Sequence, residues 1–398
     1  MRVFRSLRYR DYALFWSCDL LASLGHFVQE VALNWIAYEI TGSAMALGVL
    51  GLCGAAPRLL LGAVGGVLVD RYDRKRLLIA IQFGSALPVL IFLLLYAAGA
   101  LEFWHLLALE VLFGSIRAVN PSASQSALAD LVPRGDLMNA VSLYTIGFNF
   151  ARIVGPSLGG ILILWIGVAG CYEAFLASLL LSASGFVLMR LRERRTPAEQ
   201  SFVRELKEGF GYVWSSPVIL SSIVAAYTFS IFITTYHRFL PVFAKDVLAV
   251  GPEGLGLLMA APGVGAVASL LFLATAGERW DRARLLWVTT TVTPVFLILF
   301  CASPIFWLSL LLLALVGAGQ VSFRTISRVI IQIEVPRELL GRVMSVFNMD
   351  QGMRSAGSIV VGAFATLFGV SLGLALTAAL SLAITTTIFY RLLGRRGS

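Results

Sequence analysis

The sequence predicts an all-α integral membrane protein with twelve transmembrane helices in two six-helix bundles. Of its 398 residues, 58% are hydrophobic and only 13% are charged, and the mean hydropathy is +0.85. A soluble chain carries roughly 25% charged residues, and a membrane-spanning helix needs about 20 mainly apolar residues. Apolar stretches of that length follow one another nearly from end to end, so twelve spans with short loops fit the chain.

Twelve apolar runs, separated by polar breaks, give the expected spans. In the first half they cover residues 14–38, 45–69, 77–98, 103–126, 139–164 and 168–190. In the second half they cover residues 218–243, 254–276, 285–302, 304–330, 341–368 and 371–392. We expect three regions: an N-terminal bundle at 1–190, a cytoplasmic linker with an amphipathic surface helix at 191–217, and a C-terminal bundle at 218–398.

The basic residues indicate how the chain crosses the membrane. The net charge of +9 would suit nucleic acid, but the arginines and lysines lie in short clusters between apolar runs and form no basic face. Every cluster falls on the same side of the twelve predicted spans, and cytoplasmic loops are enriched in Lys and Arg. We therefore expect a multi-pass protein of the cytoplasmic (inner) membrane with both termini in the cytoplasm and no role in nucleic-acid binding.

The two halves repeat each other. The stretch D-R-Y-D-R-K-R-L-L runs from Asp70 to Leu78, and E-R-W-D-R-A-R-L-L follows from Glu278 to Leu286. The triplet V-P-R recurs between the fourth and fifth spans of each half. Transporters built from such repeats bind substrate near the membrane midplane and rock one half against the other.

Several motifs of this chain resemble the major facilitator superfamily. The stretch G-V-L-V-D-R-Y-D-R-K-R-L-L, from Gly66 to Leu78, resembles the signature that follows that family's second span, with Asp73 where the pattern has glycine. G-P-S-L-G-G in the fifth span resembles an element of its export-type proton antiporters. The opening F-R-S-L-R-Y-R-D-Y-A-L-F-W is similar to the transmembrane secretion effector branch, which includes enterobactin exporters and macrolide efflux proteins.

This resemblance implies two working parts. One is a cytoplasmic gate latch after the second and eighth spans, formed by Asp70, Arg71, Arg74, Lys75, Glu278, Arg279, Asp281 and Arg282. Topogenic charge explains its arginines nearly as well, but it does not explain the carboxylates. The other is a hinge in the fifth span at Gly155, Pro156, Gly159 and Gly160. Ordinary packing of small residues is the alternative for the hinge, because Gly and Pro are frequent in membrane spans.

A stripe of polar residues runs along the first span. Its members are spaced by three or four residues and therefore share one face of a helix: Asp19, Ser23, His26, Glu30 and Asn34. A charge at the centre of a span costs about 2.5 to 3.5 kcal/mol, so we expect this face to line a cavity. His26 and Glu30 could share a proton there. A structural hydrogen-bond network, gating or substrate contact remain alternatives.

Further ionisable residues lie within the predicted spans. Arg117 and Arg152 fall in the fourth and fifth spans, and Asp350 and Arg354 stand four residues apart in the eleventh. Arg117 lies near a functional arginine of related drug antiporters, without the Q-G that accompanies it there. Asp350 and Arg354 could also form a local ion pair that neutralises itself.

No catalytic or metal-binding pattern accompanies these residues. The sequence has no nucleophile elbow, phosphate loop or metal-ligand cluster, so we expect neither an enzyme nor a metal or organic cofactor. We predict a monomeric secondary transporter that contacts membrane lipids and exports a small hydrophobic or siderophore-like compound by proton antiport. A lipid or lysophospholipid flippase is the alternative within transport. A non-transporting receptor or a membrane-embedded enzyme is the alternative of another class.

Overall fold

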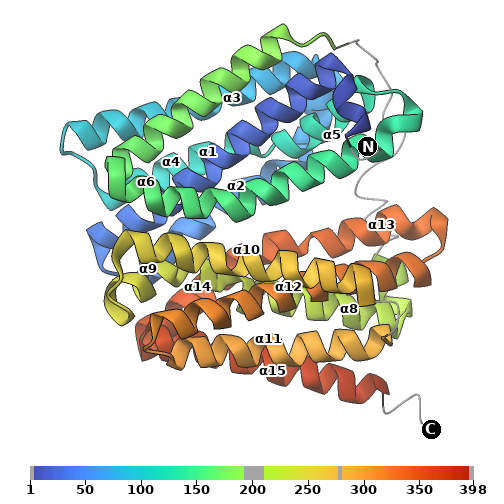
Figure 1. The fold of residues 1–398 in the computed structure, drawn as a ribbon. Helices are drawn as coiled ribbons and strands as arrows, with labels where there is room; N and C mark the ends of the chain where they lie inside the picture. Colours follow the sequence, from blue (N-terminus) through green and yellow to red (C-terminus); the bar gives the residue numbers. More distant parts are fainter. Residues whose placement is uncertain (1–3, 192–209, 277–279, 394–398) are drawn as a thin grey trace. The chain divides into compact units, whose positions relative to one another are not determined.

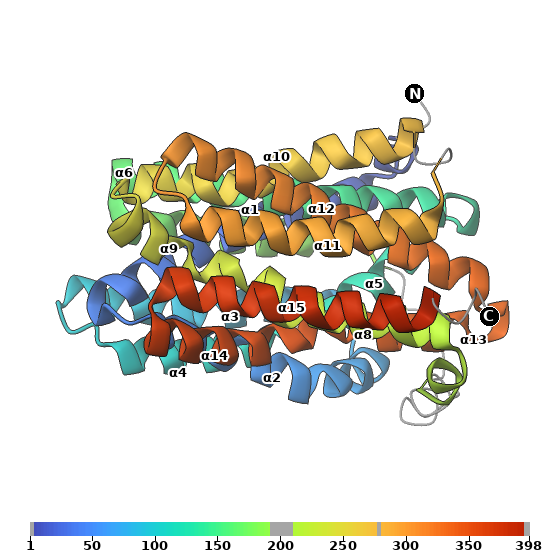
Figure 2. The ribbon, with the colours of Figure 1, turned by 90° about the horizontal axis from the view of Figure 1, so that it is seen from below.

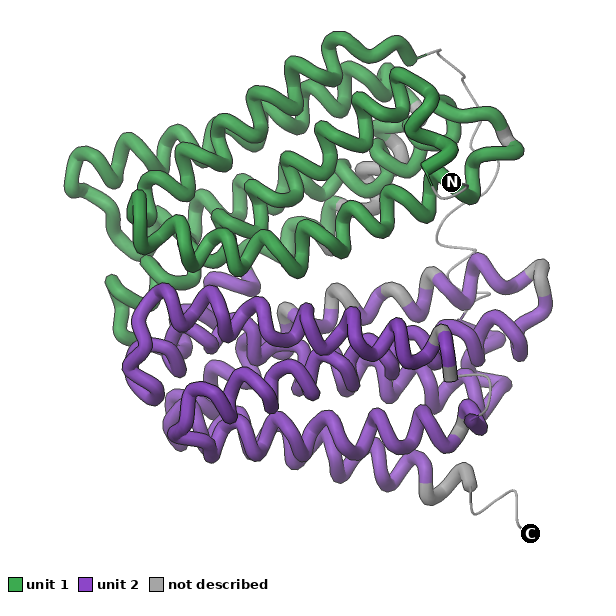
Figure 3. Tube along the Cα trace, viewed as in Figure 1, with its two compact units in different colours: residues 1–42, 53–199 green, residues 43–52, 200–398 purple. Residues whose placement is uncertain are grey.

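Two compact helical units make up the chain. The computed structural model describes residues 4–191, 210–276 and 280–393, and these ranges contain helices and loops but no strand. Unit 1 comprises Met1–Gly42 and Cys53–Glu199, and unit 2 comprises Ser43–Leu52 and Gln200–Ser398 (Figure 3). Most of the predicted linker at 191–217 falls at 192–209, outside the described residues, and its residues 210–215 are helical.

The start of the second span belongs to unit 2, although its sequence position would group it with the N-terminal bundle. Glycines allow this close packing. A Cβ atom at Gly48 would lie 2.5 Å from the carbonyl oxygen of Ser358, and one at Gly51 would lie 2.7 Å from Nε of Arg238. The backbone of these ten residues therefore approaches elements of the second repeat more closely than any larger side chain would allow.

Unit 1 is formed by the N-terminal helices in Figure 1. In chain order they are η1 (Arg5–Arg8), α1 (Arg10–Thr41), the part of α2 (Ala44–Arg71) from Cys53 onward, α3 (Arg74–Ala97), α4 (Phe103–Arg117), α5 (Asn120–Leu131), η2 (Arg134–Asp136) and α6 (Leu137–Leu188). The helix α6 contains both the fifth and the sixth predicted spans. Its backbone leaves helical geometry at Gly167, where φ is +72°, and this residue lies in the predicted gap between the two spans.

Unit 2 begins with an irregular span. Within Pro217–Val247 the chain passes through α8 (Pro217–Thr228), the π-helix η3 (Phe229–Ile233), the 3₁₀-helix η4 (Thr234–Phe239), α9 (Leu240–Val242) and the π-helix η5 (Phe243–Val247). The remaining helices are α10 (Gly251–Ala276), α11 (Arg282–Ala302), α12 (Phe306–Glu334), α13 (Arg337–Asn348), α14 (Asp350–Phe368) and α15 (Val370–Leu393). The helix α11 packs on both α12 and α15 (Figures 1 and 2).

The twelve predicted spans all appear as helical segments, and two of them are broken. Seven described segments are long and apolar enough to cross a membrane as single helices, with the merged α6 counted once. The fourth span is split into α4 and α5, because Pro121 lacks an amide proton and begins a new helix. The eleventh span is split into α13 and α14 at Met349. The helix α1 is not among the seven, and it carries the polar stripe.

The core of unit 1 forms where α1 lies along α6. Tyr12 and Phe15 are fully buried in a cluster that also draws on α3, α5 and α6. The Tyr12 hydroxyl donates a hydrogen bond to the carbonyl oxygen of Ala140 at 2.8 Å, and Nε1 of Trp16 donates one to that of Leu143 at 2.9 Å. These bonds fix the rotation of α1 against α6 and therefore the direction in which its polar side chains point.

Candidate functional site

The polar residues of α1 do not all share one environment. Asp19 interacts electrostatically with Arg117, which ends α4. The guanidinium carbon of Arg117 lies 5.5 Å from the centre of the Phe113 ring, a cation–π distance. Arg58 on α2 also lies within electrostatic range of Arg117. A carboxylate and two guanidinium groups from three helices thus form a charge cluster inside unit 1.

His26 lies about two turns after Asp19 on α1 and is surrounded by aromatic rings. The centre of its imidazole is 5.6 Å from that of Phe113 on α4 and 6.1 Å from that of Phe175 on α6. Its ring therefore lies among side chains of three helices of unit 1. The proton shared by His26 and Glu30 stays a prediction.

Glu30 and Asn34 complete the stripe towards the other end of α1. Nδ2 of Asn34 donates a hydrogen bond to the backbone oxygen of Glu30 at 2.8 Å. The side chain of Asn34 is buried, and its Oδ1 atom has no hydrogen-bond partner in the described part of the chain. A buried acceptor that is left unsatisfied costs about 1 to 3 kcal/mol, and the functional role of Asn34 stays a prediction.

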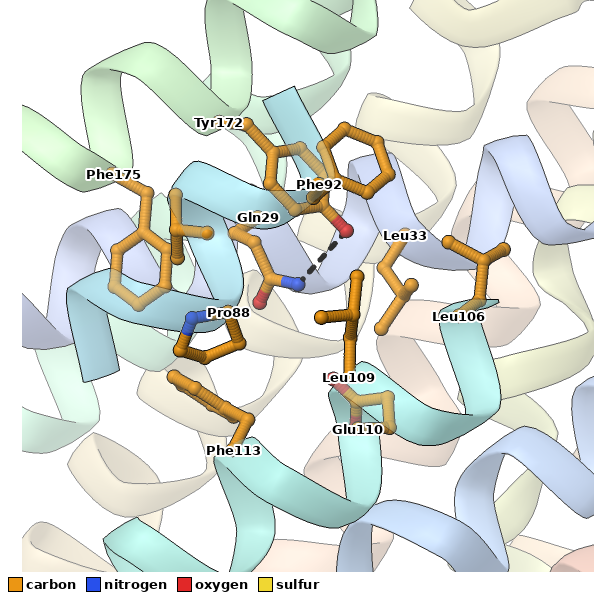
Figure 4. Close-up of a pocket in the computed structure, with 11 residues that line it drawn as sticks. Gln29, Leu33, Pro88, Phe92, Leu106, Leu109, Glu110, Phe113, Tyr172 and Phe175 are labelled. Atoms are coloured by element: carbon orange, nitrogen blue, oxygen red, sulfur yellow. Dashed lines mark hydrogen bonds between the residues drawn. The ribbon is translucent and has the colours of Figure 1, made fainter. Parts of the chain in front are cut away.

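A pocket opens beside the stripe, within unit 1 (Figure 4). Its wall is drawn from α1, α3, α4 and α6, and it is largely apolar. The lining residues are Gln29, Leu33, Pro88, Val89, Phe92, Leu106, Leu109, Glu110, Phe113, Tyr172 and Phe175. Nε2 of Gln29 donates a hydrogen bond to the Tyr172 hydroxyl at 3.1 Å, and the Tyr172 ring stacks on Phe92 with a centroid distance of 3.5 Å.

Gln29, Glu110 and Tyr172 were not anticipated from the sequence. Glu110 stands inside the predicted fourth span and is an intramembrane carboxylate by the same criterion that identified Asp19. That criterion alone would have found it. Gln29 and Tyr172 offered no such signal, because single polar side chains on buried helices are common.

Unit 2 holds an interhelical ion pair. Nη2 of Arg324 on α12 lies 3.0 Å from Oδ1 of Asp350, the first residue of α14. This pair joins two helices, and the local ion pair of Asp350 with Arg354 on the same helix stays a prediction. Arg354 lies one turn along α14 and accepts a hydrogen bond at its backbone oxygen from Ser358 at 3.1 Å. Arg152, on α6 of unit 1, is exposed.

The predicted gate residues occupy equivalent places in the two repeats. Asp73 caps α3 by accepting a hydrogen bond from the amide of Arg76 at 2.7 Å, and Asp281 caps α11 by accepting one from that of Arg284 at 3.1 Å. Asp73, which stands where the family pattern has glycine, is therefore a helix cap. Glu278 and Arg279 lie outside the described residues, as does the side chain of Asp70.

Arg74 and Lys75 tie this loop to the rest of unit 1. Arg74 forms an ion pair with Asp130 near the end of α5, and both side chains are largely buried. Nζ of Lys75 donates a hydrogen bond to the backbone oxygen of Val187, near the end of α6, at 2.7 Å. Asp130 was missed in the sequence because the predicted span ended before it. Arg71 and Arg282 are exposed.

A second cluster fixes the chain's beginning to the loop before α6. Asp136 accepts a hydrogen bond from the Tyr9 hydroxyl at 2.7 Å and forms ion pairs with Arg8 at 3.0 Å and Arg5 at 3.2 Å. These partners, Tyr9 foremost, lower the pKa of Asp136 below its usual value. The Ser6 hydroxyl adds a hydrogen bond to Oδ1 of Asn139 at 2.7 Å. This cluster had no counterpart among the sequence predictions.

The glycines of the fifth span lie against α1. A Cβ atom at Gly155 would stand 2.5 Å from Cβ of Phe27, and one at Gly159 would stand 3.1 Å from the carbonyl oxygen of Val28. The two helices approach so closely at these positions that a residue with a side chain would clash, and glycine fits. Pro156 lies within α6, and Gly160 is buried beside Gly159. The close packing is thus accounted for, and the hinge motion stays a prediction.

Comparisons with known proteins give consistent results. The model of the transmembrane secretion effector family matches residues 2–396. The chain is 25% identical to the staphyloferrin A transporter of Staphylococcus aureus, covering 94% of this chain and 95% of that one. It is 26% identical to the enterobactin exporter EntS of Salmonella choleraesuis, over 80% and 72% of the two chains. A solved bacterial homologue of the human lysosomal transporter Spinster shares the fold, with a TM-score of 0.77 at 15% identity over 96% of each chain.

Proposed function

Since this chain belongs to the transmembrane secretion effector family of major facilitator transporters, we propose that it exports a small hydrophobic or siderophore-like compound by proton antiport. Membership makes it a membrane transporter of a small molecule and not an enzyme. Export, the coupling proton and the class of substrate are the proposed part.

The charge cluster in unit 1 is the observation that carries the coupling mechanism. Asp19 and Glu30 on α1 are carboxylates within a predicted span, and Asp19 has Arg117 as its electrostatic partner. Groups of this kind are costly in a membrane and are kept where they serve a substrate or ion pathway. Protons fit such titratable side chains, and a proton gradient requires no bound cofactor. The Asn34 acceptor and the His26 imidazole extend the same path along α1.

The names of the relatives support the substrate class and the direction. One relative is named as a transporter of staphyloferrin A, one as an exporter of enterobactin, and a macrolide efflux protein of Streptococcus pyogenes is 21% identical over 93% of each chain. By analogy with these relatives, we propose that this chain exports a compound that combines apolar and polar groups. We also propose a monomer, surrounded by lipids of the bacterial inner membrane, with both termini in the cytoplasm.

The gate and the hinge belong to the same proposal. Alternating access requires a cytoplasmic contact that forms and breaks, and the loops after the second and eighth spans carry matching charges. The ion pair of Arg74 with Asp130 supports this role, because it anchors one of those loops to α5. The glycine positions of α6 against α1 would allow the two helices to slide.

The test is transport by the purified full-length protein in proteoliposomes with an imposed pH gradient. Ethidium and staphyloferrin A serve as probes, and Glu30→Gln is compared with Glu39→Gln, a control carboxylate on the exposed end of α1. We expect gradient-driven flux in the native protein and the control, and its loss in Glu30→Gln. Flux that ignores the gradient and Glu30 would contradict antiport. Movement of a labelled lysophospholipid that persists with a protonophore would instead indicate a flippase.

A further inference from the structure

The two halves of the chain differ in the charges within their predicted spans. The spans of the first half carry equal numbers of carboxylates and arginines. The spans of the second half have Asp350 as their one carboxylate, against six arginines: Arg238, Arg324, Arg328, Arg342, Arg354 and Arg391. A charge within a span is costly, and such residues usually pair with one another. The second half therefore has more positive charge within its predicted spans than one carboxylate can offset.

Two of these arginines share a face of α12. Arg324 and Arg328 stand four residues apart, and Gln320 stands four residues before Arg324, so the three lie within about 80° of the helix circumference. Nη2 of Arg324 donates to Oδ1 of Asp350 at 3.0 Å. A guanidinium group has five N–H donors, and this is the one hydrogen bond of the Arg324 side chain within the described residues. Arg324 therefore keeps donors for a second acceptor.

Arg328 adds a second positive charge beside the same carboxylate. It is exposed and makes no ion pair or hydrogen bond with the described residues. It lies within electrostatic range of Arg324, which repels it, and of Asp350, which attracts it. Asp350 is already paired with Arg324, so one carboxylate faces two guanidinium groups. Like charges four residues apart destabilise a helix, and an added anion between them would relieve the repulsion.

Neutral donors accompany the two arginines. Nε2 of Gln320 is buried and has no hydrogen-bond partner in the described part of the chain. The buried hydroxyl of Ser327, the residue before Arg328, likewise has no partner there. A buried donor without an acceptor costs free energy, and an oxygen atom of a bound molecule would satisfy it. This face of α12 thus offers donors and positive charge, and a negatively charged acceptor complements both.

We propose that this face of α12 binds the carboxylate or phosphate group of an anionic ligand, with its oxygens between Arg324 and Arg328 and with Gln320 as a further donor. Guanidinium groups suit such oxyanions, because their parallel N–H donors can bond two oxygens at once. The inference rests on the proposed export function only in taking the ligand to be the exported compound. Binding of its acidic group in unit 2 would leave the α1 carboxylates of unit 1 to the proton.

The test compares phenylacetate with phenylacetamide, which have nearly the same shape and differ in charge. Equilibrium dialysis measures their binding to the full-length protein in phosphatidylcholine nanodiscs, and empty nanodiscs correct for partition into lipid. We expect phenylacetate to bind about tenfold or more tightly, the ratio that one hydrogen bond to a charged group supplies. In Arg328→Gln this ratio should fall to about a third or less, and Arg328→Lys should retain a preference for phenylacetate. The matched control is Arg284→Gln, an exposed arginine of α11, which should keep the native ratio.

Two further variants examine the other members of the site. Arg324→Lys keeps the charge beside Asp350 but loses the parallel donors, so it should lower the ratio. Gln320→Met should weaken both probes, because the carbonyl oxygen of the amide also accepts a hydrogen bond. Thermal unfolding of each variant shows whether it is folded, and the exposed position of Arg328 makes its substitutions the decisive ones.

Equal affinities in the native protein, a ratio that survives in Arg328→Gln, or no binding of either probe would overturn the proposal. An equal fall in Arg284→Gln would do so too, because it would reflect net charge alone. Nanodiscs of phosphatidylglycerol distinguish the sources of the oxyanion. Phenylacetate binding that persists there assigns the site to a soluble ligand, and its displacement assigns the site to a lipid headgroup. No gradient is involved, so anion binding can fail while proton-driven export holds, and the reverse.

Discussion

The first helices of the two repeats differ in their backbone and in their side chains. They are α1 in unit 1 and the segment Pro217–Val247 in unit 2. The helix α1 runs unbroken over 32 residues and carries Asp19, His26 and Glu30. Its counterpart has no carboxylate before Asp246, and its backbone passes through two π-helices and a 3₁₀-helix. One repeat has carboxylates along a regular backbone, and the other has an irregular backbone with His237 and Arg238 but no carboxylate before Asp246.

Hydroxyl groups stabilise the irregular helix. The Thr235 side chain donates to the backbone oxygens of Ser230 at 3.3 Å and Ile231 at 2.8 Å, and Thr234 donates to that of Phe229 at 3.2 Å. Such bonds satisfy carbonyl groups that a regular helix would pair through its own amides. Because π-turns and mid-helix 3₁₀ turns often mark functional bends, the proposed mechanism assigns the coupling proton to α1 of unit 1 and the bending helix to unit 2.

Asp19→Asn should produce the largest effect of the changes that probe this contrast. It removes the carboxylate whose charge offsets that of Arg117, and an uncompensated charge within a span is costly. We expect a clearly lower unfolding midpoint in detergent and loss of gradient-driven flux. The double variant Asp19→Asn/Arg117→Gln should regain stability but not transport. If the single variant is as stable as the native protein, the electrostatic contact does not stabilise unit 1.

Tyr236→Phe tests the irregular helix with an intermediate effect. The Tyr236 ring is fully buried, and its hydroxyl has no hydrogen-bond partner in the described residues. Removing an unsatisfied buried hydroxyl should raise the free energy of unfolding by about 1 kcal/mol. Chemical denaturation in detergent measures this, with Tyr227→Phe as the matched control, because Tyr227 donates to the backbone oxygen of Val346 at 2.6 Å. Loss of stability in Tyr236→Phe would show that the hydroxyl is paired.

Asp136→Asn should have the smallest effect, because it removes partly exposed contacts at the surface of unit 1. Tyr9, Arg5 and Arg8 lower the pKa of Asp136, so the carboxylate stabilises the fold above the unfolded value of about 3.9. That contribution is lost as the pH falls below about 4 and the carboxylate becomes protonated. Unfolding midpoints of native and Asp136→Asn protein should therefore differ at pH 7 and converge at low pH. A constant difference would contradict this assignment.

The sequence was sufficient for the fold and for part of the site. Apolar runs and the repeated D-R-x-D-R motif predicted the twelve helical segments, because burial in lipid leaves few alternatives for such runs. The gap between the fifth and sixth spans coincides with Gly167. The breaks near Pro121 and Met349 were missed, because the polar residues around them, N-P-S-A-S-Q-S and N-M-D-Q, were counted as parts of continuous spans.

The contacts between side chains were harder to predict. Arg74 pairs with Asp130 and Arg324 pairs with Asp350, and each pair joins helices that are far apart in the sequence. A helical period shows which residues share a face, but it does not show which helix lies opposite. Glu110 was overlooked for another reason, since the residues three and four positions away on either side of it are apolar or glycine.

Proton movement driven by the substrate tests the central claim most directly. Proteoliposomes containing a pH-sensitive dye are given an ethidium gradient without any imposed pH difference, and native protein is compared with Glu30→Gln and Asp350→Asn. The account predicts proton flow opposite to ethidium in native protein and, at a reduced rate, in Asp350→Asn, but none in Glu30→Gln. Proton flow that survives in Glu30→Gln and disappears in Asp350→Asn would place the coupling ion in unit 2 and contradict it.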